Sequence, residues 1–224
     1  MSLFAQIRNR FSAPVAPATA GHAPVRPTRP RRFSCATVPY ILLVDESGST
    51  SSAPRVAGGR TVTRMQAIQD AAARYLRMLS AANPRQPVAV IGFTDAATVY
   101  HRPAPVGPAF HSLTHALGQL HPQGCTNLSA GLTSALRLVA DAGTPGGTLV
   151  IVTDGAANLE KDLLPGLVER AKASRVRIHT IGVGNNGDGD YDRALLFNMA
   201  RSTGGRFTSA DSFAALCNAL GRVA

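Results

Sequence analysis

The apolar positions of this chain fall into two alternating patterns. Short continuous runs such as Tyr40–Val44 (YILLV) and Gly147–Thr153 (GTLVIVT) are typical of strands that are buried on both faces of a sheet. Longer segments repeat their apolar side chains every three or four residues, which is typical of helices with one buried face. The predicted strands are residues 40–44, 88–94, 97–102, 147–153, 176–183 and 206–210, and the predicted helices are residues 63–82, 109–120, 128–142, 163–174, 191–203 and 212–223.

Strands that alternate with helices predict an α/β fold, because parallel neighbouring strands need a helical crossover between them. The second and third strands are joined only by the short turn at Asp95–Ala97. We therefore expect a hairpin that gives the sheet one antiparallel edge strand. The predicted fold is a doubly wound, mostly parallel six-stranded sheet with helices on both faces.

Basic charge is concentrated at the start of the chain. Of the formal net charge of +10, residues 1–35 contribute +6, from six arginines and no acid, which leaves +4 for the remainder. The same segment is rich in proline, so we expect residues 1–35 to form a disordered basic arm and residues 36–224 to form the folded domain. Apolar residues recur at helical spacing within residues 1–11, which is the one segment that we expect could reach a membrane surface.

The location of the protein is indicated by its apolar runs and its cysteines. The apolar runs are far shorter than the ~20 residues that a bilayer span needs, so we expect a soluble protein. Cys35, Cys125 and Cys217 are far apart, without a C-x-x-C or a partnered histidine, which predicts neither a zinc site nor a disulfide framework. A cytoplasmic location is the simplest interpretation. The acid-free, arginine-bearing start also resembles a transit peptide, and this alternative stays open.

Oxygen-bearing side chains follow two of the buried strands and precede one helix. In open sheets ligands bind at the carboxyl ends of the strands, so we expect these side chains to meet there. A set of oxygen donors without histidine or cysteine suits a hard cation, Mg²⁺ in particular; Mn²⁺ or Ca²⁺ could replace it, although Ca²⁺ usually takes more ligands. The alternative is that these residues cap the next helix and bind turn amides. The candidate ligands are Asp45, Ser47, Ser49, Thr126 and Asp154.

Three separated segments, Asp45–Ser49 (DESGS), the loop before residue 128 with Thr126, and Thr153–Gly155 (TDG), together resemble the metal-ion-dependent adhesion site of von Willebrand factor A domains. The resemblance covers about residues 36–224, including the order of elements. It implies that Ser47 and Ser49 bind the metal through their hydroxyls, and that Thr126 binds it when the site is occupied. It also implies that Asp45 and Asp154 act largely through water, and that an Asp or Glu of a partner protein completes the coordination.

The expected function is therefore a non-enzymatic, Mg²⁺-dependent protein-interaction module. By analogy with bacterial members of the family, its partner could be an AAA+ ATPase or another component of an intracellular multiprotein system. A metal-dependent phosphohydrolase that uses Asp45 or Asp154 is the first alternative, although no lysine or second acid is recognisable to complete a phosphotransfer site. Nucleic-acid binding through residues 1–35 is the second alternative, and the lack of an evident aromatic and basic platform in the domain disfavours it.

Two further segments need an interpretation. Residues 50–63 are longer than the turn usual in the family, which predicts either a lid or partner contact bearing Arg55 and Arg60 or a tolerated insertion. Gly182–Gly187 matches G-x-G-x-x-G, but too little chain follows it to build a dinucleotide-binding fold, so we interpret it as a turn. The acids after it lack the glycine and glutamate of a calcium loop, and we expect Asp190 or Asp192 to cap the next helix.

Overall fold

The computed structural model describes residues 38–52, 62–157, 159–184 and 190–223. The predicted basic arm of residues 1–35, most of the insertion at residues 50–63 and the second half of the segment Gly182–Gly187 lie outside the described residues. Within the described ranges, no helix is both long enough and apolar enough to cross a membrane.

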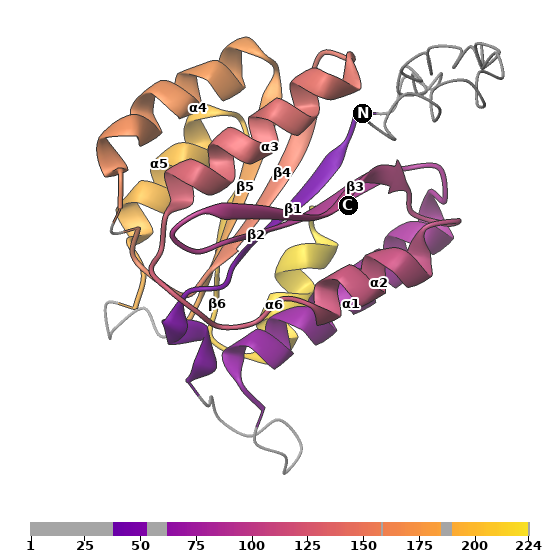
Figure 1. The fold of residues 1–224 in the computed structure, drawn as a ribbon, viewed down its shortest axis with the longest axis horizontal. Helices are drawn as coiled ribbons and strands as arrows, with labels where there is room; N and C mark the ends of the chain where they lie inside the picture. Colours follow the sequence, from indigo (N-terminus) through magenta and orange to yellow (C-terminus); the bar gives the residue numbers. More distant parts are fainter. Residues whose placement is uncertain (1–37, 53–61, 158, 185–189, 224) are drawn as a thin grey trace, which may run out of the picture. The chain divides into compact units, whose positions relative to one another are not determined.

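A six-stranded sheet forms the centre of the fold, in the order β3-β2-β1-β4-β5-β6 (Figure 1). Neighbouring strands are parallel, except that β2 and β3 pair antiparallel as a hairpin. The fold class predicted from the alternating patterns is therefore confirmed, including its antiparallel edge. The strands are β1 (Tyr40–Asp45), β2 (Pro87–Phe93), β3 (Ala97–Pro105), β4 (Gly147–Thr153), β5 (Val176–Val183) and β6 (Phe207–Ala210).

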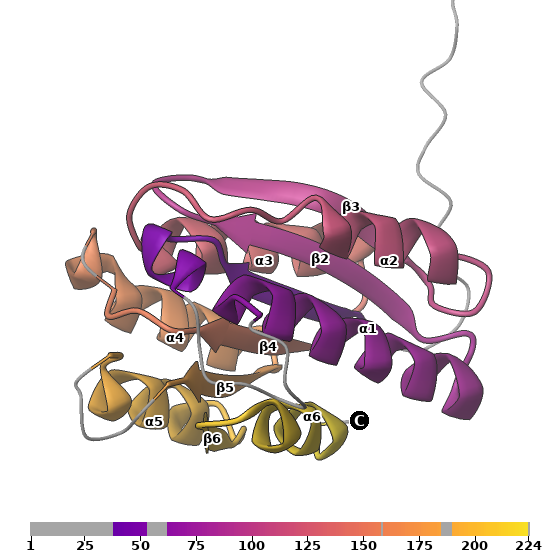
Figure 2. The ribbon, with the colours of Figure 1, turned by 90° about the horizontal axis from the view of Figure 1, so that it is seen from below.

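Helices cover both faces of the sheet, α1, α2 and α6 on one and α3, α4 and α5 on the other (Figures 1 and 2). The side chains of β1 alternate between the two layers: Leu42 and Val44 pack with the first group of helices, and Ile41 and Leu43 pack with the second. This double burial explains why β1 is a continuous apolar run. The helices are α1 (Arg64–Ala82), α2 (Phe110–Gly118), α3 (Leu128–Ala142), α4 (Leu164–Ala173), α5 (Arg193–Ser202) and α6 (Phe213–Gly221), with short 3₁₀ helices η1 (Gly48–Ser51) and η2 (Lys161–Leu163).

The order of the strands reverses at β1. The chain runs outward through β2 and β3 on one side of β1 and then returns to place β4 on its other side. At such a reversal the connections that leave the two central strands diverge, which opens a crevice at the carboxyl ends of those strands. Since β1 ends at Asp45 and β4 ends at Thr153, the predicted ligand residues lie at this crevice.

Candidate metal centre

The segment after β1 curls into η1 instead of continuing as a strand. The backbone N–H of Ser47 donates a hydrogen bond to Oδ1 of Asp45 (2.8 Å), and the N–H of Thr50 donates to the carbonyl of Ser47 (3.0 Å). The curl brings the hydroxyl oxygens of Ser47 and Ser49 to 2.9 Å from each other. Three side chains at alternate positions therefore meet at one point, as the spacing of Asp45, Ser47 and Ser49 predicts.

The exit of β4 joins this group through two hydrogen bonds. The Ser49 hydroxyl donates to Oδ1 of Asp154 (2.7 Å), and the Thr153 hydroxyl donates to Oδ2 of Asp45. Each bond connects residues more than 100 positions apart in the sequence, at separations of 105 and 108. The two central strand ends are thus linked side chain to side chain.

Thr126 lies at the same place, across a small space that Gly155 leaves open. A Cβ atom added to Gly155 would lie 3.0 Å from Oγ1 of Thr126, 3.5 Å from Oγ of Ser49 and 3.6 Å from Oδ2 of Asp45. Oxygen atoms from three separate segments therefore surround one point, and a side chain at residue 155 would crowd them. All five predicted ligand residues belong to this cluster.

The loop that carries Thr126 is attached to the β2–β3 hairpin. The N–H of Cys125 donates to Oδ1 of Asp95 (3.0 Å), and the N–H of Asn127 donates to the carbonyl of Thr94 (2.7 Å). The side-chain amide of Asn127 donates to the carbonyl of Asp95 (3.1 Å). Bonds on both sides of Thr126 thus fix its position, and Asp95 is more than the turn residue that the sequence predicts.

Glu46, between two predicted ligands, fastens the exit of β1 to its surroundings. It is buried, and its Oε1 accepts hydrogen bonds from the Tyr100 hydroxyl (2.9 Å) and from the N–H of His121 (2.9 Å). Gly92 makes room for it, since a Cβ there would lie 1.8 Å from Oε2 of Glu46. Burial and the contact with Glu46 raise the pKa of Tyr100 to about 12, so the phenol stays a hydrogen-bond donor.

Burial controls the charge state of both predicted acids. It raises the pKa of Asp45 to about 6, against the opposing effect of the hydrogen bonds from Thr153 and Ser47. Burial also raises the pKa of Asp154, which the Ser49 hydroxyl and the Arg64 guanidinium counteract. Two buried carboxylates side by side favour a cation, because each ionised form lacks solvent stabilisation.

Arg64, the first residue of α1, supplies one such positive charge from within the chain. Its guanidinium contacts Oδ2 of Asp154 (3.1 Å) and Oδ2 of Asp190 (2.8 Å). Sequence reasoning missed this residue, because its partners lie 90 and 126 positions away. Of the two residues expected to cap α5, the cap is Asp192, whose carboxylate accepts a hydrogen bond from the N–H of Leu195 (2.9 Å). Asp190 instead pairs with Arg64.

The alternative that these residues cap the next helix and bind turn amides holds in one part only: Asp45 accepts a hydrogen bond from the turn N–H of Ser47, but the capping part is not supported. Helix α1 is capped by Thr63, which forms a capping box with Gln66, and the Ser47 side chain makes no capping hydrogen bond to η1. Among the described residues no three His, Cys, Asp or Glu side chains gather as a metal-binding group. A set of two carboxylates and three hydroxyls instead fits a hard divalent cation that keeps part of its water shell.

Comparison with known proteins gives one family. The sequence matches the family model described as von Willebrand factor type A domain over residues 40–156. Among curated protein sequences, none matches the chain.

Solved structures resemble the whole described fold. A protein described as von Willebrand factor type A from Catenulispora acidiphila has a TM-score of 0.69 and 20% identity, with 83% of this chain and 41% of that chain covered. The D319A mutant of the PilB minor pilin from Streptococcus sanguinis has a TM-score of 0.66 and 14% identity, with 84% and 60% covered. The hypothetical protein BatB from Bacteroides thetaiotaomicron has a TM-score of 0.59 and 20% identity, with 83% and 98% covered. At these identities the likeness shows the fold alone, and the chain spans less than two thirds of the first two proteins.

Proposed function

Because the chain belongs to the von Willebrand factor type A domain family, we propose that it is a Mg²⁺-dependent module that binds an acidic residue of a partner protein. Domains of this family are generally protein-interaction modules. The observation that carries the proposal is the single cluster of oxygen atoms at the carboxyl ends of β1 and β4, reached also by the loop before α3.

The residues that would hold the cation are the five predicted ones. In the arrangement that the resemblance implies, the hydroxyls of Ser47, Ser49 and Thr126 contact the metal, and Asp45 and Asp154 act through water. A divalent ion bound mainly by neutral hydroxyls keeps most of its positive charge, so it can accept a carboxylate from another protein. Mn²⁺ or Ca²⁺ could replace Mg²⁺ in such a set of ligands.

The chain's own residues prepare the site for such a ligand. The Thr153 hydroxyl and the Ser47 N–H hold the two carboxylate oxygens of Asp45, so this side chain has one orientation. Arg64 holds Oδ2 of Asp154 and leaves Oδ1 directed at Ser49. The acids are therefore oriented before any cation arrives, which reduces the ordering cost of binding.

A hydrolase gains no support from this geometry. The described residues bring no lysine within ion-pair distance of Asp45 or Asp154, and the charged group beside them, Arg64, pairs with Asp154 and Asp190. The partner is defined by its chemistry, an exposed Asp or Glu, and by analogy with the family an AAA+ ATPase or another member of a multiprotein assembly is a candidate.

The proposal is tested by titrating Mg²⁺ into metal-free protein in a calorimeter and by comparing proteins retained from a cell extract in Mg²⁺ and in chelator. Ser49→Ala should weaken Mg²⁺ binding at least tenfold. Ser51→Ala is the matched control, because the Ser51 hydroxyl is exposed and donates to the carbonyl of Gly48 (2.7 Å), outside the cluster. Equal Mg²⁺ affinity in the wild type and the Ser49→Ala variant would overturn the proposal.

A further inference from the structure

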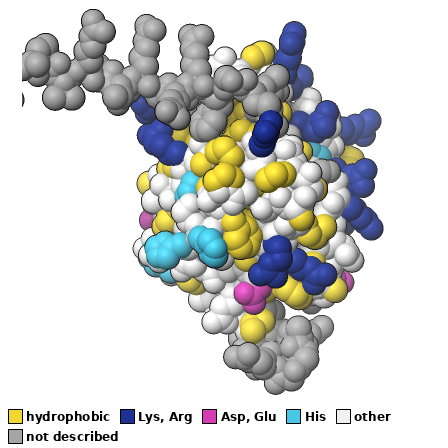
Figure 3. Space-filling view, turned by 90° about the vertical axis from the view of Figure 1, so that its right-hand side faces the viewer, with side chains coloured by type: hydrophobic (Ala, Val, Ile, Leu, Met, Phe, Trp, Pro, Cys, Tyr) yellow, Lys and Arg dark blue, Asp and Glu magenta, His cyan; other side chains and the backbone are white. Residues whose placement is uncertain are grey.

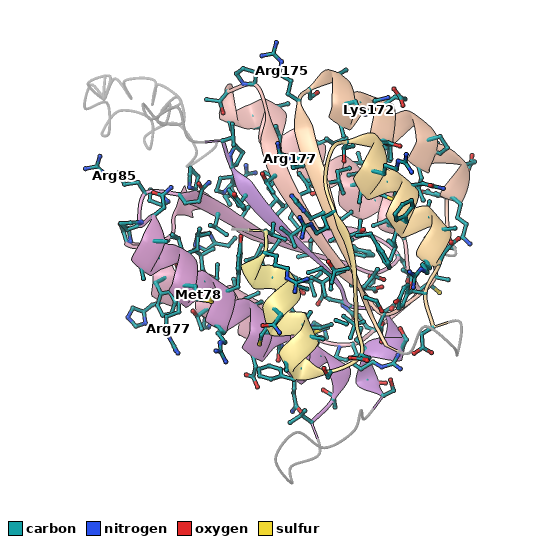
Figure 4. The ribbon with its side chains drawn as sticks, turned by 180° about the vertical axis from the view of Figure 1, so that it is seen from behind. Arg77, Met78, Arg85, Lys172, Arg175 and Arg177 are labelled. Carbon is teal, nitrogen blue, oxygen red and sulfur yellow. The ribbon has the colours of Figure 1, made fainter. Side chains whose placement is uncertain are left out.

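A second concave surface lies between α1 and α6, away from the candidate metal centre. It is a groove of about 400 Å³ lined by Arg74, Met78, Cys217, Asn218, Gly221 and Arg222. Met78 is 14 residues beyond Arg64 on α1, which is about 21 Å along the helix at 1.5 Å per residue. Figure 4 shows Arg77 and Met78 on the outer side of α1, on the side of the molecule that also carries α6.

The groove has an apolar part. Met78 is 48% exposed and is one of three large hydrophobic side chains that are exposed among the described residues. Cys217 is half-buried, and burial raises the pKa of its thiol, so the side chain is neutral at neutral pH. An exposed methionine beside a neutral thiol offers a small apolar contact surface, and methionine adapts to differently shaped partners.

Two arginines, Arg74 and Arg222, line the groove, and Asp70 is an acid that lies near it. Arg74 and Arg222 are exposed, as is Arg77, which precedes Met78 but does not line the groove. Within the described part of the chain no carboxylate lies within 4.0 Å of the guanidinium nitrogens of these three arginines. Asp70, one turn before Arg74, raises the pKa of the Cys217 thiol and Arg74 lowers it, but the Asp70 carboxylate forms no ion pair with Arg74. Figure 3 shows several separate groups of basic side chains, in dark blue, and few acidic ones, in magenta, on the face of the molecule that it draws.

Helix-end electrostatics explain only one of these arginines. Arg222 is at the C-cap of α6, where a positive charge stabilises the helix. Arg74 and Arg77 lie inside α1, where the dipole has little effect. Unpaired like charges on one surface repel one another, so an anionic ligand would relieve a cost that the free domain bears.

The composition of the groove selects among anionic ligands. The chain's own residues 1–35 are excluded, since they carry six arginines and no acid. Among the described residues, no aromatic side chain lines the groove to stack on a nucleic-acid base, and a membrane surface would need more apolar area than Met78 provides. A second copy of the chain could offer exposed Leu163, which has acids beside it in the sequence. Lys161 lies among those acids, however, and would be repelled by the arginines of the groove. Arginine and methionine are both enriched in protein–protein interfaces.

We propose that the groove between α1 and α6 docks an acidic segment of a partner protein, in which an apolar side chain contacts Met78 and flanking carboxylates pair with Arg74 and Arg222. This site needs no metal, so a partner that also offers a carboxylate to the metal centre would be held at two points, and each would strengthen the other through effective concentration.

The test uses the full chain in chelator, so that its outcome does not depend on the metal centre. The probe is a fluorescein-labelled peptide with a Leu-Phe pair flanked by glutamates, and binding is followed by fluorescence anisotropy at low salt. We expect saturable binding that weakens at least tenfold in Arg74→Glu/Arg222→Glu and about threefold in Met78→Ser, and that weakens when the Leu-Phe pair becomes Ser-Ser. The matched control is Arg137→Glu, an exposed arginine of α3 on the opposite face, which should leave binding unchanged.

Four outcomes would overturn the proposal. The first two are the absence of saturable peptide binding and a loss of peptide affinity in Arg137→Glu equal to that in the double variant. The third is tighter binding of duplex DNA or phosphatidylserine vesicles than of the peptide, if the double variant abolishes it. The fourth is self-association of the free protein that the double variant abolishes. The last two would reassign the groove to a polyanion or to a second copy of the chain. Circular dichroism of each variant separates loss of binding from loss of folding.

Discussion

Replacing Asp45 by Asn should stabilise the metal-free protein while it removes metal binding. Burial raises the pKa of Asp45 from 3.8 to about 6. The shift is about two units, and each unit corresponds to ~1.4 kcal/mol, so the ionised carboxylate destabilises the folded state by up to ~3 kcal/mol at neutral pH. Asn keeps an acceptor for the Ser47 N–H and gains a donor towards the Thr153 hydroxyl, which can then donate to the carbonyl of Gly155. We expect the variant to be ~1–3 kcal/mol more stable in chelator at pH 7.

The stability difference between this variant and the wild type should depend on pH, with a sign set by the raised pKa of Asp45. The folded state binds the Asp45 proton more tightly than the unfolded state, so the wild-type protein gains stability from this group as the pH falls through about 6. Asn does not titrate, and the stability advantage of the variant should therefore shrink by ~1.3 kcal/mol between pH 7 and pH 5.

The assay is urea unfolding followed by far-UV circular dichroism in chelator at both pH values. Asp211→Asn, which changes an exposed acid, is the control and should show neither effect. With Mg²⁺ present, the stability advantage of Asp45→Asn over the wild type should shrink, because the cation stabilises the wild type and not the variant. An Asp45→Asn protein that is less stable than the wild type in chelator, or an advantage that does not change with pH, would refute the reasoning.

Three further substitutions probe the parts of the site. Gly155→Ala places a Cβ 3.0 Å from the Thr126 hydroxyl, so Mg²⁺ affinity measured by calorimetry should fall about tenfold, while thermal stability in chelator changes little. Unchanged Mg²⁺ affinity would contradict the idea that a side chain at residue 155 crowds the ligand oxygens. Arg64→Gln leaves Asp154 buried without its cation, so the free energy of unfolding in urea and chelator should fall by ~2 kcal/mol. Mg²⁺ should restore more stability to this variant than to the wild type. An equal Mg²⁺ effect in both proteins would argue against the idea that Arg64 and the metal neutralise the same carboxylate. Asp95→Ala releases the loop around Thr126, so Mg²⁺ affinity should fall several-fold while the unfolding midpoint stays nearly constant. A fall in stability without a fall in Mg²⁺ affinity would mean that Asp95 stabilises only the hairpin.

The fold was predictable because its signals are local. A strand buried on both faces, such as β1, must be apolar at every position, and a helix between two such strands must be apolar on one face. The one antiparallel edge was also predictable, since the turn between β2 and β3 is too short for a crossover. Strand lengths were less accurate: β3 runs to Pro105, beyond the segment 97–102 that its alternation predicts, because pairing with β2 and not composition sets its end.

The candidate site was predictable only in part. Asp45, Ser47 and Ser49 could be grouped because they follow one strand at alternate positions, and Asp154 because it follows another. Arg64 and the hydrogen bond from Thr153 to Asp45 carry no local pattern, since each depends on how distant elements pack. Sequence reasoning finds the residues that a motif names, and the residues that orient them emerge only when the chain is folded.

The most direct test of the account is an anomalous difference map from crystals of the protein grown with Mn²⁺. We predict one strong peak among the hydroxyl oxygens of Ser47, Ser49 and Thr126, with Asp45 and Asp154 in its outer shell. The peak should be absent from crystals of Ser49→Ala grown in the same solution. Strong Mn²⁺ density at another place, or none at this cluster, would contradict the central claim.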